Sequence, residues 1–204
     1  MLLVNAVLSA LLNLVLLAGL PFLLYFTYQK TRRKRGFGET ARRAGLQLCE
    51  RRYLGFSLAF ALASVVGLLV WPPPLEPLMR PRSPQRAFVG LGLGGPAIPM
   101  ALLYGVVKTG FPEELLFRGL IAGSLSRRLS LGWANFSQAV VFLVPHVFAV
   151  VVMPEMWGLL PLVFASSLFL GWLRIRSGSI VGPWLIHAAS NVVTCLSVAV
   201  RTAV

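Results

Sequence analysis

Acidic residues are scarce in this chain of 204 residues, which has six glutamates and no aspartate. They are opposed by 19 lysines and arginines, so the formal net charge is +13. A charge this basic occurs in nucleic-acid-binding proteins, but 57% of the residues are hydrophobic and the mean hydropathy is +0.78. This composition is typical of a multi-pass membrane protein whose basic loops meet anionic lipid. We therefore expect the lipid bilayer as a partner, and no nucleic acid.

Cysteine and histidine are equally sparse, with two of each. Cys49 lies in a basic stretch and Cys195 in an apolar run, and their spacing matches no metal or redox motif. Both are expected to be free thiols, and the sequence indicates no cofactor and no bound metal. It also contains no internal repeat, no low-complexity tail and no segment typical of a soluble domain.

Long apolar runs dominate the rest of the chain. A helix of about 20 apolar residues crosses the hydrocarbon core of a bilayer, which is about 30 Å thick. The first run is too long for the core of a signal peptide and has no basic start, so we expect it to be retained. The sequence predicts an all-α, polytopic transmembrane helical bundle of about six to seven helices. The candidate spans are residues 2–28, 53–71, 87–107, 131–153, 157–173 and 179–200.

Charged and proline-rich segments between these runs indicate how the chain crosses the bilayer. Residues 30–52 hold nine lysines and arginines, so the positive-inside rule makes this loop cytoplasmic and leaves the N-terminus outside. The connection over residues 72–84 is expected outside and without regular helix. Residues 87–107 are interrupted by Pro96 and Pro99, a pattern of close helix packing or of a broken helix lining a cavity.

One polar stretch stands out in this apolar sequence, residues 111–119, which read Phe-Pro-Glu-Glu-Leu-Leu-Phe-Arg-Gly. Ionisable groups at membrane depth cost several kcal/mol unless they are paired, so they are functional by default. Residues 108–110 are expected to end the preceding span. A new helix would begin at Pro112 and continue to about Leu125, with both carboxylates in its first turn, where the helix dipole favours negative charge.

The spacing within this stretch separates its two carboxylates. Glu114 and Arg118 are four residues apart, so they share a helix face and can form an ion pair. Glu113 is five residues from Arg118 and points about 100° away from Glu114. We therefore expect Arg118 to hold Glu114, which leaves Glu113 free for chemistry.

Residues 111–125 can be placed relative to the membrane in two ways. If the helix over residues 111–125 is re-entrant or shallow, the arginines within residues 127–128 and 174–176 are cytoplasmic. If it spans the membrane, they lie outside. The positive-inside rule favours the first arrangement.

Three more polar side chains lie in apolar spans, namely His146 and the pair His187 and Asn191, which share one side of a helix. Buried polar groups need partners, and none of these has an evident one nearby, so we expect them to converge with Glu113. A carboxylate and an imidazole can hold a water and take its proton as it attacks a carbonyl. A second imidazole and an amide N–H can stabilise the resulting oxyanion, so the set is suited to hydrolysis.

Three motifs in this order resemble those of the CPBP family: Glu113-Glu114-Leu-Leu-Phe-Arg118, Phe142-x-x-x-His146 and His187-x-x-x-Asn191. The family comprises the CAAX proteases and bacteriocin-processing (Abi) proteins, and it is similar to the type II CAAX prenyl endopeptidases. Its members are glutamate-dependent intramembrane endopeptidases with a multi-helix fold. The resemblance covers roughly residues 100–195.

The resemblance implies a role for each polar residue. Glu113 would activate a water together with His146. His187 and Asn191 would form the oxyanion hole. The active site would lie inside the helical bundle, and no metal or cofactor would take part.

For the chain as a whole, length and composition predict one integral-membrane domain over residues 1–204. Residues 1–95 would hold the N-terminal spans and the basic loop, and residues 96–200 the catalytic core, in which Glu114 and Arg118 support the site. The substrate would be a protein or peptide with a membrane-associated segment, cut near or within the membrane. Because the chain is short for the eukaryotic enzymes, the expected location is the plasma membrane of a prokaryote.

Other interpretations stay open. Glutamate at a helix start is often a capping group, and a single buried histidine or asparagine is often structural. Two histidines and a glutamate could hold zinc in a metal-dependent version of the same protease, although the chain has no His-Glu-x-x-His pair. The polar cluster could also bind rather than cut, in a membrane immunity protein, a scaffold or a small transporter. The motifs specify no substrate, so maturation, protein sorting and bacteriocin immunity all fit them.

Overall fold

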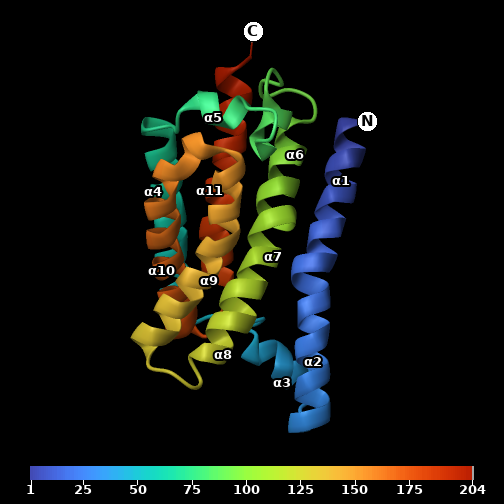
Figure 1. Cartoon of the computed structure of the whole chain (residues 1–204), viewed down its shortest axis with the longest axis vertical. Helices are drawn as coiled ribbons and strands as arrows, with labels where there is room; N and C mark the ends of the chain where they lie inside the picture. The colour runs from blue at the N-terminus through green and yellow to red at the C-terminus, as the bar shows by residue number, and fades with distance from the viewer. Residues whose placement is uncertain (204) are drawn as a thin grey trace.

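The computed structural model describes residues 1–203, which form long helices joined by short connections. Figure 1 shows these helices standing side by side, with both termini at the same end of the bundle. Residues 1–203 form six long helical segments: the N-terminal helix, built from α1 (Leu2–Asn13), η1 (Leu14–Gly19) and α2 (Leu20–Arg33); α4 (Arg51–Val70); the glutamate helix, built from α6 (Ala97–Leu102), η3 (Leu103–Gly110), α7 (Phe111–Glu113), η4 (Glu114–Ala122) and α8 (Gly123–Leu125); α9 (Leu131–Val152); α10 (Leu160–Ser177); and α11 (Val181–Arg201). Shorter helices lie in the connections: α3 (Phe37–Arg43), α5 (Leu75–Met79), η2 (Pro84–Phe88) and η5 (Pro154–Leu159).

The long segments have the length and the surface of membrane spans. Within residues 1–203, five helices are long and apolar enough to cross a membrane. In α4 only 6% of the most apolar stretch is buried inside the protein, so its large side chains face outward, as they would toward lipid tails. The glutamate helix carries four charged side chains, yet at 1.5 Å per residue it extends over about 43 Å, more than the hydrocarbon core. The predicted all-α transmembrane bundle is confirmed, and the chain is an integral membrane protein.

The glutamate helix begins later than predicted. The sequence suggested a span over residues 87–107 interrupted by two prolines, but the helix starts at Ala97. Pro96 is its N-cap and Pro99 lies in its first turn, where a missing N–H removes no helical hydrogen bond. The prolines therefore mark the start of this helix and do not interrupt it.

The same helix does not break where a break was predicted. It continues through Lys108 and Pro112 as far as Leu125, so the prediction of a new helix beginning at Pro112 is wrong. Glu113 and Glu114 lie near its middle and gain nothing from the dipole of a helix N-terminus. Proline in an α-helix removes the bond between residues four apart and clashes with the turn before it. Here the turns η3 and η4 on either side of α7 are π-helical, bonded five residues apart, which accommodates the proline.

The connection after α4 contains more helix than predicted. Residues 75–79 form α5, which begins directly after Pro74, so the expectation of no regular helix over residues 72–84 is wrong there. Ser83 then caps η2 by accepting a hydrogen bond from the backbone N–H of Gln85 at 3.3 Å. Proline favours the first turn of a helix, which explains why a proline-rich segment holds two short ones.

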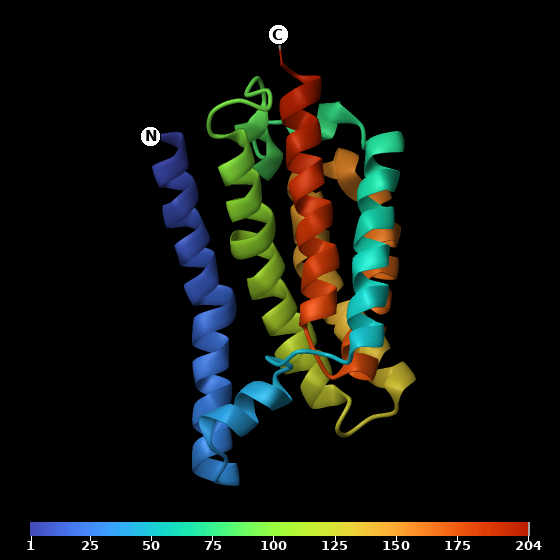
Figure 2. The same cartoon turned by 180° about the vertical axis from the view of Figure 1, so that it is seen from behind.

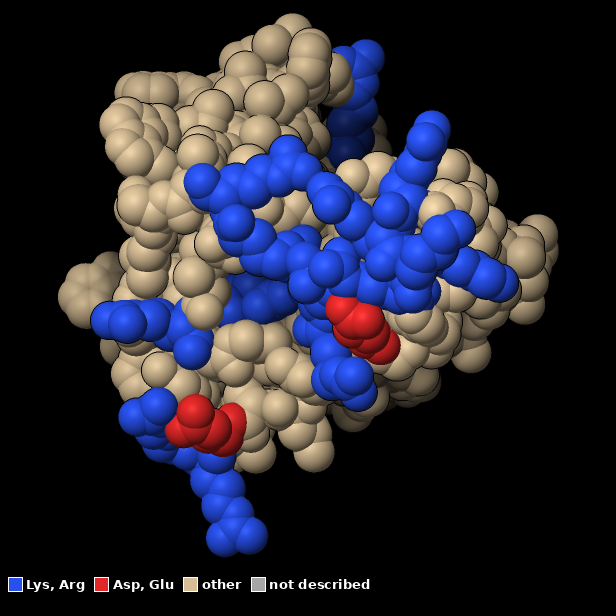
Figure 3. All heavy atoms as spheres, turned by 90° about the horizontal axis from the view of Figure 1, so that it is seen from below, with Lys and Arg blue, Asp and Glu red and all other residues tan. Residues whose placement is uncertain are grey.

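Basic side chains gather at the end of the bundle away from the two termini, which we call the basic end. Figure 3 views this end and shows lysine and arginine covering much of it. Because residues 97–125 make one crossing and not two, the arginines after α8 and at the end of α10 lie beside the first basic loop. The expectation that a spanning helix would place these arginines outside, away from the basic loop, is therefore wrong, and the positive-inside rule predicts that the basic end is cytoplasmic. Thirteen basic residues lie there: Lys30, Arg32, Arg33, Lys34, Arg35, Arg42, Arg43, Arg51, Arg52, Arg127, Arg128, Arg174 and Arg176.

The C-terminal helix α11 packs between α4 and the glutamate helix, as Figure 2 shows. A Cβ atom at Gly105 would lie 2.9 Å from the carbonyl oxygen of Ala188, and one at Gly110 would lie 3.2 Å from the Trp184 ring. Glycine at these two positions lets the backbones approach as small residues do at membrane helix crossings. This close crossing brings the two carboxylates of the glutamate helix against His187.

Candidate active site

Glu114 and Arg118 form a fully buried ion pair on the glutamate helix. The distance between Glu114 Oε1 and an Arg118 terminal nitrogen is 3.1 Å, and both side chains have an exposed fraction of 0%. The predicted pair is therefore present. Removing one partner of a buried ion pair costs about 3–5 kcal/mol, because it leaves the other charge without compensation.

Two neighbouring helices hold the guanidinium group of Arg118 from the other side. Its second terminal nitrogen donates a hydrogen bond to Ser167 Oγ on α10 at 3.1 Å. The group also lies over the ring of Phe142 on α9, 4.0 Å from the ring centre. An arginine over an aromatic ring contributes about 2 kcal/mol when it is shielded from water. Arg118 thus links the glutamate helix to α9 and α10.

His187 on α11 stands between the two glutamates. Its Nδ1 lies 2.8 Å from Glu114 Oε1, and its Nε2 lies 4.0 Å from Glu113 Oε2. Since a carboxylate only accepts, Glu114 fixes Nδ1–H as the donor and orients the ring, as carboxylates orient histidines at many reactive sites. The Glu113 side chain is 22% exposed, whereas Glu114 is fully buried. The two adjacent carboxylates therefore occupy different environments.

Asn191, one turn after His187, has a partner that the sequence did not reveal. Its amide nitrogen donates to Thr109 Oγ1 at 2.8 Å, and Thr109 in turn donates to the carbonyl of Tyr104 at 2.9 Å. This chain of bonds fixes the orientation of the amide group. One amide N–H and the carbonyl oxygen of Asn191 are not used in it.

His146 on α9 bonds to its own helix. Its Nδ1 lies 2.9 Å from the carbonyl oxygen of Phe142, which can only accept, so Nδ1 carries the proton and Nε2 carries a lone pair. Its ring also packs against Phe142, with ring centres 4.6 Å apart. The sequence predicted that His146 and Glu113 lie close together. Within residues 1–203, however, no ion pair or hydrogen bond joins their side chains.

A cavity of about 580 Å³ joins these groups. It lies between α4, α9, α10 and α11 and reaches the glutamate helix at Arg118. His146, His187 and Asn191 all line it, so three of the four predicted catalytic residues share one space, and the fourth, Glu113, lies next to His187. Most of the remaining wall is apolar and aromatic, which suits an uncharged segment of a substrate.

Thr109 and Ser167 are site residues that sequence reasoning missed. Thr109 holds the Asn191 amide, and Ser167 holds Arg118. The position of Thr109, four residues before Glu113 on the same helix, was a usable signal. Ser167 gave none, because serine is common in membrane spans and its link to Arg118 exists only in the folded bundle.

Metal-ligating side chains are few around this site. Among residues 1–203, no three histidine, cysteine, aspartate or glutamate side chains are grouped as a metal ion would require. Cys49 and Cys195 are both free, and Cys195 is buried in α11. The polar set is therefore carboxylate, imidazole, amide and guanidinium.

Comparison with known proteins adds one match. Residues 95–193 match the family model described as "Rce1-like: Type II CAAX prenyl endopeptidase Rce1-like". This region contains the glutamate helix from before its start, α9, α10 and most of α11, and with them all the candidate site residues. No curated protein and no solved structure gives a significant match.

Proposed function

We propose, from the membership of residues 95–193 in the Rce1-like family of type II CAAX prenyl endopeptidases, that this chain is a glutamate-dependent intramembrane endopeptidase. Peptidase activity of the CAAX type follows in general terms from the family, and the residues and steps are our proposal. The observation that carries it is the Glu113 carboxylate beside His187, 4.0 Å from Nε2, with that ring held by the buried Glu114 at 2.8 Å.

The first step is attack by water. A water held by Glu113 and His146 attacks the carbonyl carbon of the scissile peptide bond, and its proton passes to the Glu113 carboxylate. His146 lines the cavity, and the lone pair on its Nε2 can accept a hydrogen bond from this water. General acid–base catalysis of this kind contributes about 10²–10⁴-fold to the rate.

The second step is stabilisation and collapse of the tetrahedral intermediate. The amide N–H of Asn191 that does not bond to Thr109 donates to the oxyanion. So does the Nε2–H of a His187 ring protonated on both nitrogens beside Glu113 and Glu114; each donor is worth about 3–4 kcal/mol in such sites. The proton on Glu113 then passes to the nitrogen of the leaving group, and the C–N bond breaks. The products are a carboxylic acid and an amine.

The cavity supports a substrate with an apolar, membrane-associated segment. Phe60, Leu162, Val163 and Phe169 form part of its wall, and their elements, α4 and α10, also carry outward-facing apolar residues. A protein or peptide anchored in the bilayer can approach such a cavity without leaving the membrane. A C-terminal or membrane-anchored segment is the class of substrate that we propose.

The test compares peptide termini in membrane fractions of cells that carry the wild-type protein or Glu113→Gln. Glu50→Gln is the matched control, because it removes one carboxylate from an exposed position at the start of α4. If the proposal holds, one or a few proteins keep an extra segment in Glu113→Gln cells only. Indistinguishable termini, together with rescue of a deletion phenotype by Glu113→Gln, would instead assign the polar cluster to binding.

A further inference from the structure

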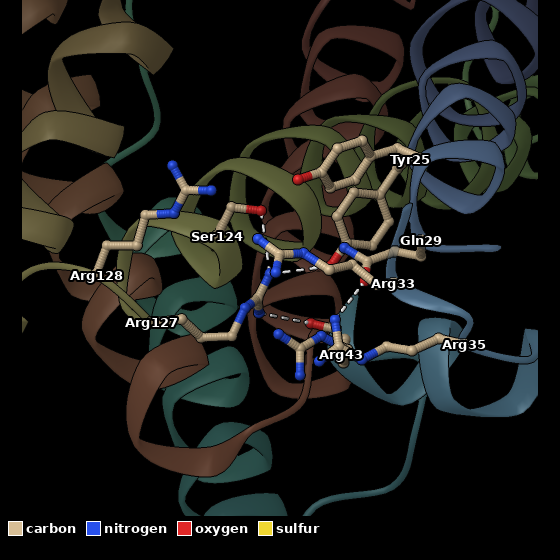
Figure 4. A pocket seen from close by; sticks show the side chains of 9 residues that line it. Tyr25, Gln29, Arg33, Arg35, Arg43, Ser124, Arg127 and Arg128 are labelled. Atoms are coloured by element: carbon tan, nitrogen blue, oxygen red, sulfur yellow. Dashed lines mark hydrogen bonds between the residues drawn. The ribbon is translucent and has the colours of Figure 1, made fainter. Parts of the chain in front are cut away.

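A second pocket lies at the basic end, outside the candidate active site. It is formed between α2, α3 and the segment from α8 to Arg128, and its volume is about 390 Å³. We call it the arginine pocket, because five arginines line it: Arg33, Arg35, Arg43, Arg127 and Arg128. Figure 4 shows these side chains reaching it from three parts of the chain.

Hydrogen bonds within the protein position some of these arginines. Arg127 donates to the Tyr25 hydroxyl at 2.9 Å, to Ser124 Oγ at 3.1 Å and to the backbone carbonyl of Arg43 at 3.4 Å. These bonds link α8 to the N-terminal helix and to α3 (Figure 4). Arg127 is therefore held in place on the pocket wall by neutral acceptors.

The positive charge of the pocket is poorly compensated within the protein. Arg35 pairs with Glu39 at 2.5 Å, but within residues 1–203 no ion pair involves the other four arginines. Arg43 Nε is buried and has no hydrogen-bond partner among those residues. Burial lowers the pKa of Arg127, and the positive charges of Arg43, Arg35 and Arg128 lower it further, against an opposing effect of Tyr25. Like charges held this close favour a bound anion.

The surroundings of the pocket place it at the depth of lipid headgroups. It lies at the cytoplasmic end of the N-terminal helix, whose lipid-facing leucines include Leu23 and Leu24, 57% and 63% exposed. Tyr28 and Phe37 next to it are also exposed, as aromatic side chains are at membrane interfaces. Anionic lipid is concentrated in the cytoplasmic leaflet and attracts basic segments there.

We propose that the arginine pocket binds the phosphate group of an anionic phospholipid. Guanidinium groups match the geometry of phosphate oxygens and form charge-assisted hydrogen bonds with them. The acyl chains would lie along the outward face of the N-terminal helix. A bound phosphate would join α2 and α3 to the cytoplasmic end of the glutamate helix. The inference does not depend on the proposed peptidase activity.

The test titrates the purified full-length protein in detergent with short-chain phosphatidylglycerol, short-chain phosphatidylcholine and inorganic phosphate, and counts bound ligand by native mass spectrometry. Both lipids contain a phosphodiester, but phosphatidylglycerol has a net negative headgroup, whereas phosphatidylcholine also carries a choline cation. The arginines should repel this cation, so the comparison tests whether the pocket requires an anionic headgroup. The variant is Arg43→Gln, which removes no side-chain hydrogen bond or ion pair present in residues 1–203, so we expect it to fold like the wild type. Arg32→Gln is the matched control, because Arg32 is exposed at the same end but does not line the pocket.

The wild-type protein is expected to retain phosphatidylglycerol in preference to phosphatidylcholine. Arg43→Gln should weaken that binding about tenfold or more, as expected for loss of a charged hydrogen-bond donor, and Arg32→Gln less than about twofold. Equal losses in the two variants would overturn the proposal in favour of diffuse attraction to the basic end. Inorganic phosphate that displaces the lipid at equal concentration would also overturn it, because the site would then be one for free phosphate.

Discussion

Replacing Glu114 by glutamine keeps the shape of the side chain but removes one charge from a buried pair. Arg118 would keep its hydrogen bond to Ser167 and its contact with the Phe142 ring, but its charge would have no carboxylate beside it. Breaking a buried pair in this way costs about 3–5 kcal/mol in the free energy of unfolding. For a chain of this length, such a loss lowers the thermal midpoint by roughly 6–20 °C.

The assay is thermal unfolding of the purified protein in detergent, with the wild type, Glu114→Gln and the double variant Glu114→Leu/Arg118→Met. Replacing both partners by apolar residues of similar volume is often neutral or stabilising. The double variant should therefore recover most of the lost stability. It should not recover peptidase activity, because His187 Nδ1 would have no acceptor to orient it.

Stability and activity measured together distinguish a role of Glu114 in stabilising the fold from a role in orienting the His187 ring. A midpoint for Glu114→Gln within about 2 °C of the wild type, which corresponds to less than about 1 kcal/mol, would refute the ion-pair reasoning. A double variant with both wild-type stability and wild-type activity would refute the claim that Glu114 positions the imidazole.

Three further predictions concern the helix crossing, the asparagine and metal. Gly105→Ala should destabilise the protein by about 1–3 kcal/mol in thermal unfolding, because the new methyl group would contact the backbone of α11. The control is Gly67→Ala in α4, which has open space around it and should change the free energy of unfolding by no more than about 1 kcal/mol. Thr109→Val removes the acceptor for the Asn191 amide and should lower kcat of peptide cleavage with little change in KM. The control Thr31→Val, at an exposed position of α2, should leave kcat and KM unchanged. Chelator treatment followed by metal analysis should leave cleavage intact, and stoichiometric zinc whose removal stops cleavage would contradict a metal-free site.

The sequence predicted most of the spans and the local pairing within the site. Apolar runs of about 20 residues identify membrane helices, because in lipid a single segment can satisfy its backbone hydrogen bonds by itself only as a helix. Spacing of four residues was enough to pair Glu114 with Arg118, because both lie on one helix. The same reasoning failed at residues 108–112, where glycine and proline usually end a helix but π-helical turns continue it.

Partners from different helices could not be predicted. The link from Asn191 to Thr109 and the link from Arg118 to Ser167 exist only because α10 and α11 pack on the glutamate helix. The arginine pocket is a further case, since residues 30–52 alone are typical of a solvated cytoplasmic loop. It becomes a pocket only when the end of α8 brings Arg127 against that loop.

The most direct test of the account is the rate of peptide cleavage by the purified, reconstituted protein on a substrate identified from membrane termini. Wild type, Glu113→Gln and the control Glu50→Gln would be compared at equal folded protein. Loss of the group that takes the proton from water should slow Glu113→Gln by about 10²–10⁴-fold and leave Glu50→Gln at the wild-type rate. Cleavage by Glu113→Gln at a rate within about tenfold of the wild type would contradict the assignment of Glu113 as the group that activates water.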